Sequence, residues 1–179
     1  MSAIRHIARG IDRINHGIGS VVAWIALAMV LAQFLVVLLR YVFGLGFVQL
    51  QESIIYMHGL LFMLGAGYAL MRDAHVRVDV FYRGASERTK AWVNLWGVFL
   101  LLWPLCVLIF YVAWPYVGAA WAVREGSREA SGIPGIYLLK TVILVFAVLM
   151  FAQGLSLALR SVLVLAGRER MPEPVRESL

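Results

Sequence analysis

Four long apolar blocks constrain this chain more than any other feature. They cover residues 18–39, 53–71, 91–117 and 138–162. An α-helix rises about 1.5 Å per residue, so roughly 20 apolar residues cross the ~30 Å hydrocarbon core of a bilayer. Because lipid offers the backbone no hydrogen-bond partner, such segments form helices. The sequence therefore predicts an all-α integral membrane protein with four transmembrane helices.

The composition leaves little room for anything outside the membrane. Of the 179 residues, 62% are hydrophobic and 15% are charged, whereas soluble domains average about 45–50% apolar and about 25% charged. We therefore expect a single four-span membrane domain over residues 1–179. The net charge of +6 does not indicate a nucleic-acid partner, because the cations flank apolar blocks and do not gather on a soluble face.

The cations do predict the orientation of the chain. Lys and Arg accumulate in the cytoplasmic segments of membrane proteins. Twelve of the sixteen lie before the first block, between the second and third, or at and beyond the end of the fourth, and four lie in or next to the other two connections. We expect both termini and the 72–90 connection to be cytoplasmic in a bacterial inner membrane. The connections near 40–52 and 118–140 should face outward.

The first 18 residues carry isoleucines spaced alternately by three and four. This spacing places one apolar stripe along a helix, with the arginines off the stripe. It predicts an amphipathic helix lying at the membrane interface, where arginines meet phospholipid headgroups. The alternative is a simple extension of the first span. The stripe consists of Ile4, Ile7, Ile11, Ile14 and Ile18.

Few polar groups lie inside the predicted spans. The simplest interpretation of Gln33 and His58 is a buried side chain bonded to a neighbouring helix. One intramembrane histidine and one cysteine, Cys106, indicate no haem, metal or disulfide chemistry. We thus expect no catalytic residue, cofactor or metal. The small residues of 53–71 predict a closely packed, central second span.

Four short motifs follow one another over about 40 residues. The first span ends in Arg40-Tyr41-Val42-Phe43-Gly44, and Glu52 opens the second. Gly65-Ala66-Gly67-Tyr68-Ala69-Leu70 and His75-Val76-Arg77-Val78-Asp79 come next. This ordered set resembles the small membrane subunit (DctQ-like) of tripartite ATP-independent periplasmic, or TRAP, transporters. Gln51-Glu52 departs from that family, which often has two adjacent acids here.

The resemblance implies a small scaffold subunit without chemistry of its own. Its partners would be a large permease subunit, which carries the substrate and sodium sites, and a periplasmic binding protein, which delivers an organic anion. Residues 125–129 with Ile133-Pro134 resemble the branches that handle 2-oxo acids or related carboxylates. The matched residues would serve assembly. They are Arg40, Tyr41, Phe43, Gly44, Glu52, Gly65, Gly67, His75 and Asp79.

Two other functions stay open at this point. A small channel or exporter would need a polar line through the membrane, for which Gln33 and His58 are the candidates. A membrane anchor of a redox complex, such as a four-helix b-type cytochrome, would need paired intramembrane histidines.

Overall fold

The computed structural model describes residues 2–75, 82 and 84–169, and this part of the chain contains helices and no strand. This confirms the all-helical prediction. Four helices are long and apolar enough to cross a membrane: Ile4–Val42, Val48–Met71, Glu87–Ala122 and Ile136–Leu165. The elements are α1 (Ser2–Val42), α2 (Val48–Met71), α3 (Glu87–Gly97), the π-helical η1 (Val98–Leu102), α4 (Trp103–Ala122) and α5 (Ile136–Leu165).

Helix α1 contains both the isoleucine stripe and the first apolar block. It runs for 41 residues without a break, so the N-terminal segment is not a separate helix. Ile7 and Ile14 are exposed, at 52% and 61%, whereas Ala8 and Asn15 are buried. The face that packs against the protein is thus the small and polar one. The position of the isoleucines at the membrane interface stays a prediction.

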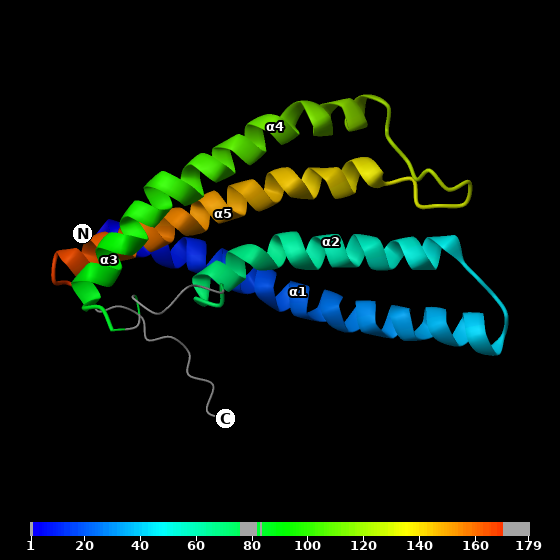
Figure 1. The fold of residues 1–179 in the computed structure, drawn as a ribbon, viewed down its shortest axis with the longest axis horizontal. Coiled ribbons are helices and arrows are strands. Elements are labelled where there is room, and N and C mark those ends of the chain that lie inside the picture. The colour runs from blue at the N-terminus through cyan, green and yellow to red at the C-terminus, as the bar shows by residue number, and fades with distance from the viewer. Residues whose placement is uncertain (1, 76–81, 83, 170–179) are drawn as a thin grey trace.

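The helices form an open row in place of a closed bundle. Figure 1 shows α4, α5, α2 and α1 side by side in that order, with the first turns of α1 crossing to lie against α5. Within the described residues, α4 packs against α5 and touches neither α1 nor α2. We call the end with the N-terminus and residues 165–169 the terminal end. The end with connections 43–47 and 123–135 is the loop end.

Helix α5 is the central element of this arrangement. It contacts α1, α2, α3, η1 and α4, whereas α2 contacts only α1 and α5. It supplies nine buried residues, and α2 supplies only Gly67. The sequence predicts that the second span contacts other spans of this chain on one side and the large subunit on the other. Helix α2 does lie between α1 and α5, and its contact with a large subunit stays a prediction. Helix α2 approaches α5 closely at Gly59 and α1 closely at Gly67, while the buried residues of α5 lie between Ala147 and Val164.

The third span is one long helix that passes through a widened turn. Pro104, near the start of α4, has no N–H to donate and would break a regular helix. The π-helical segment η1 precedes it, and the N–H of Trp103 bonds to the carbonyl of Val98, five residues back. Such a wider turn lets a helix continue past an irregularity. The Trp103 indole donates to the Phe151 carbonyl at 3.2 Å and so holds this turn against α5.

Gly154 allows the widened turn to approach α5, and this generates a prediction. A Cβ on Gly154 would lie 2.8 Å from Leu102 Cδ2 and 3.0 Å from Trp103 Nε1. We expect Gly154→Leu to destabilise the protein by about 1–3 kcal/mol through overpacking. Thermal melting in detergent measures this change. Gly97→Leu is the control, because nothing lies within 4 Å of its Cβ position. Equal melting of the two variants would contradict the packing described here.

Candidate functional site

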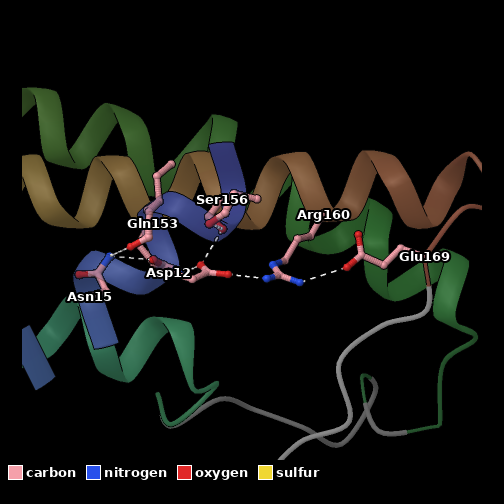
Figure 2. Close-up of polar contacts among 8 residues, drawn as sticks. Asp12, Asn15, Gln153, Ser156, Arg160 and Glu169 are labelled. Atoms are coloured by element: carbon pink, nitrogen blue, oxygen red, sulfur yellow. Dashed lines mark hydrogen bonds and ion pairs between the residues drawn. The ribbon is translucent and has the colours of Figure 1, made fainter. Parts of the chain in front are cut away.

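A chain of polar side chains joins α1 to α5 at the terminal end (Figure 2). Helix α1 buries Ala8, Asn15 and Val22, which are seven residues apart, and Asp12 lies on the same face. This face presents its polar groups to α5. We call the set the terminal-end cluster. It consists of Asp12, Asn15, Gln153, Ser156, Arg160 and Glu169.

Asp12 is the centre of the terminal-end cluster. Its Oδ1 accepts hydrogen bonds from Ser156 Oγ at 2.8 Å and Gln153 Nε2 at 3.1 Å. Its Oδ2 accepts from Arg160 Nη2, with which it forms an ion pair. Arg160 Nη1 also donates to Glu169 at 3.1 Å. Hydrogen bonds to a charged group are stronger than neutral ones, so one carboxylate fastens two turns of α5 to α1.

Asn15 connects a third helix to the same point. Its Nδ2 donates to Gln153 Oε1 at 2.8 Å, and both side chains are buried. Its Oδ1 is buried and has no conventional hydrogen-bond donor among the described residues. A Cβ on Gly67 of α2 would lie 2.5 Å from this oxygen. The glycine hydrogen in that position therefore points at the Asn15 carbonyl, a weak polar contact that brings the two backbones together.

The contact between α1 and α2 continues along the membrane from this point. A Cβ on Gly19 would overlap the Tyr68 ring. His16 meets the same ring edge-on, with ring centroids 6.1 Å apart, and Arg72 Nε donates to the Tyr68 hydroxyl at 3.1 Å. Gly65 is less constrained, because a Cβ there would meet only Val22 Cγ1, at 3.5 Å. Of the two glycines singled out in the sequence, Gly67 is the one that the crossing requires.

Glu52 fastens the loop end. Its carboxylate accepts a hydrogen bond from the backbone N–H of Ile133 at 2.6 Å and another from Ser127 Oγ. The Tyr56 hydroxyl donates to the Ile133 carbonyl at 3.4 Å. A Cβ on Gly132 would lie 2.7 Å from Glu52 Oε2, so glycine is needed for the loop to approach. We call Glu52, Tyr56, Ser127 and Ile133 the loop-end cluster.

The loop is also held from the α4–α5 side. Lys140 Nζ forms an ion pair with Glu125 at 2.5 Å and lies 4.0 Å from the centroid of the Tyr116 ring. The Trp121 indole donates to Thr141 Oγ1 at 2.9 Å. Connection 123–135 is thus anchored to three helices, which makes it a fixed surface at the loop end.

The first matched motif, residues 40–44, contains the end of α1. Gly44 adopts a left-handed conformation, with φ of 68°, which glycine takes without strain. The N–H of Leu45 then bonds back to the Leu39 carbonyl at 3.0 Å, a common way to end a helix. Arg40, Tyr41 and Phe43 are exposed. Arg40 makes no ion pair with Glu52 in the described residues, because Glu52 is turned toward the 123–135 connection.

Four further residues singled out in the sequence lie outside both clusters. His75 is exposed just beyond α2, and Asp79 lies outside the described residues. Gln33 and His58 are both exposed, so the interpretation that they are buried and bonded between helices is wrong within this chain. Among the described residues, no three His, Cys, Asp or Glu side chains gather where they could hold a metal ion.

Sequence reasoning missed most of the terminal-end cluster. The isoleucine stripe places Asp12 on the polar side of an amphipathic helix, and no sequence pattern singles out Gln153 or Ser156. One signal was present, namely the seven-residue spacing of Ala8, Asn15 and Val22. In a membrane helix, small and polar residues with such spacing mark the packed face.

The sequence model of the family described as tripartite ATP-independent periplasmic transporters, DctQ component, matches residues 21–164. The chain belongs to this family. DctQ proteins are transporter subunits that work with a large permease and a substrate-binding protein in TRAP systems. No curated protein and no solved structure matches this chain. The family match contains Glu52 and Gly67 but begins after Asp12 and Asn15.

The two glycines of α2 provide a matched pair for a test. Gly67→Ala places a methyl group against the buried Asn15 oxygen, so we expect a loss of about 1–3 kcal/mol in stability. Gly65→Ala makes an ordinary contact with Val22 and should melt close to the unmodified protein. Thermal melting in detergent distinguishes the two. A Gly65 variant that loses as much as the Gly67 variant would refute this account of the crossing.

The ion pair of the terminal-end cluster can be tested by a double-mutant cycle. Asp12→Asn and Arg160→Gln should each reduce stability, because the first leaves Arg160 with Glu169 alone and the second leaves the partly buried Asp12 without a counter-charge. The double variant should lose less than the two single losses added together, with a coupling energy of about 1–3 kcal/mol. Melting of the four proteins measures it. Additive losses would show that the contact contributes nothing.

Proposed function

We propose that this chain is the small scaffold subunit of an ion-coupled TRAP transporter that takes up an organic anion. It pairs with a large permease subunit, receives no substrate itself and has no chemistry of its own. The observation that carries the proposal is the family match over residues 21–164. The four apolar helices of the described chain support it, since they are long enough to lie beside a partner through the whole bilayer.

The two clusters support a static role. The terminal-end cluster joins α1 to α5, and the loop-end cluster joins α2 to the 123–135 connection. Side-chain hydrogen bonds at both ends of the helices resist sliding of one helix along another. Such a unit enlarges a fixed frame around the moving part of a transporter. Glu52 and Gly67 act in this frame as assembly residues, and the exposed Arg40 is available to a partner.

The proposed orientation places both termini in the cytoplasm of a bacterial inner membrane. The loop end, with its anchored 123–135 connection, then faces the periplasm, where a binding protein delivers substrate. We further propose sodium as the coupling ion and a carboxylate, such as a 2-oxo acid, as the substrate. These assignments rest on the resemblance and on the distribution of charges in the sequence.

A topology experiment tests the orientation. Reporter fusions after Arg88, in α3, and after Glu125, in the loop-end connection, should report opposite sides of the membrane. Arg88 should report the cytoplasm, because cations accumulate on that side. An alkaline phosphatase fusion after Glu125 should be active. An inactive fusion there, paired with an active one after Arg88, would reverse the proposed orientation.

A transport experiment tests the scaffold role. Arg40→Ala and Glu52→Ala, made in the complete transporter, should lower the yield of the assembled complex or its transport rate. They should leave the preference among competing carboxylates unchanged, because Glu52 holds the 123–135 connection and Arg40 is available to a partner subunit, and neither is proposed to line a substrate site. Uptake of labelled substrate against unlabelled competitors measures both. A changed order of competitors would contradict the proposal.

A further inference from the structure

Two polar side chains lie at mid-membrane depth on the open surface of α1 and α2. Gln33 is nine residues before the end of α1, and His58 is ten residues after the start of α2. At about 1.5 Å per residue, both lie roughly 14–15 Å from the loop end, near the middle of a ~30 Å hydrocarbon core. Both are exposed, and neither makes a hydrogen bond within the described residues.

A groove between the two helices connects Gln33 to the loop end. It has a volume of about 380 Å³ and is lined by aliphatic side chains, among them Val37 and Ile55, by the aromatic Tyr41 and by three amide or charged side chains. The polar residues are Gln33, Arg40 and Gln51. His58 continues the exposed face of α2, one turn beyond Ile55. We call the groove together with His58 the α1–α2 groove. Its polar residues lie on a surface that is otherwise apolar.

The polar side chains of the groove favour a protein helix over a phospholipid as its occupant. A phospholipid phosphate could meet Arg40, which makes no ion pair in the described part of the chain. Its acyl chains, however, offer no hydrogen bond to Gln33 or His58 at mid-membrane depth, and an unpaired polar group in hydrocarbon is costly. A membrane helix with polar side chains could satisfy all three, because interhelical hydrogen bonds form within the bilayer.

We propose that the α1–α2 groove receives a transmembrane helix of the large permease subunit. That helix carries hydrogen-bonding side chains opposite Gln33 and His58 and a carboxylate within reach of Arg40. The proposal rests on the proposed function and adds to it the surface and the chemistry of pairing. It leaves the outer face of α4, where Leu101 and Leu108 are exposed at 72% and 57%, to lipid.

Site-specific photocrosslinking tests the groove directly. The photoreactive residue p-benzoylphenylalanine replaces Ile55, in the groove, or Leu108, on α4, in the chain co-expressed with the large subunit. Both positions are exposed and apolar in the isolated chain, at 62% and 57%. We expect irradiation at position 55 to yield an adduct with large-subunit peptides and irradiation at 108 to yield none. An adduct at 55 with phospholipid only, or with a second copy of this chain, would overturn the proposal.

Substitutions in the same complex give an independent measure. Ile55→Trp should reduce co-purification of the large subunit at least about tenfold, which corresponds to a loss near 1.4 kcal/mol, and Leu108→Trp should leave it unchanged. The double variant Gln33→Leu/His58→Leu removes the polar groups with little added bulk and should reduce recovery about threefold to tenfold. Unchanged recovery for both groove variants would refute the proposal.

The results distinguish a failure of the proposed function from a failure of the groove proposal. If the unmodified chain brings down no large subunit, the proposed function fails, and the groove proposal fails with it. If the large subunit co-purifies and crosslinks at position 108 in place of 55, the proposed function stands and only the groove assignment is wrong. Melting of each variant alone, in detergent, identifies any that fail to fold.

Discussion

Hydrocarbon cannot hydrogen-bond, so each polar group within the membrane must find its partner inside protein. Buried polar groups need partners wherever water is excluded, and the terminal-end cluster supplies them. Asp12 and Asn15 meet Gln153, Ser156 and Arg160, and these bonds place α1 across α5. Helix α2 packs against this crossing at Gly67, whose lack of a side chain allows the close approach. Within the described residues, α4 packs against α5 and against neither α1 nor α2.

Side-chain hydrogen bonds connect different kinds of element at the two ends of the molecule. At the terminal end they join helix to helix, whereas at the loop end Glu52 joins a helix to the backbone of a connection. Between the two ends the contacts are mainly those of small and aliphatic residues. An open row of helices held in this way exposes long apolar faces, as a subunit with a membrane-spanning partner requires. The polar α1–α2 groove is the exception on this surface.

The sequence specifies the spans and the family, because length, apolarity and ordered motifs are local properties. It specifies much less about packing. The Ile4–Ile18 stripe resembles the buried face of a soluble helix, but Ile7 and Ile14 are exposed and Asn15 is buried. Asp12 and Arg160 are separated by 148 residues, and no spacing rule pairs them. Glu52 was noticed for its charge, yet its partner is a backbone N–H that no side-chain pattern reveals.

The central position of α5 has a consequence for how the protein is made. It is the last helix of the described chain to leave the ribosome, yet α1, the first, depends on it for its polar partners. Until residue 160 has been synthesised, Asp12 has no counter-charge from Arg160 and Asn15 has no amide from Gln153. Helices α1 and α2 can pair earlier through their own contacts, but α1 gains its polar partners only when synthesis is nearly complete. A chain that stops short of α5 therefore leaves Asp12 and Asn15 without these partners.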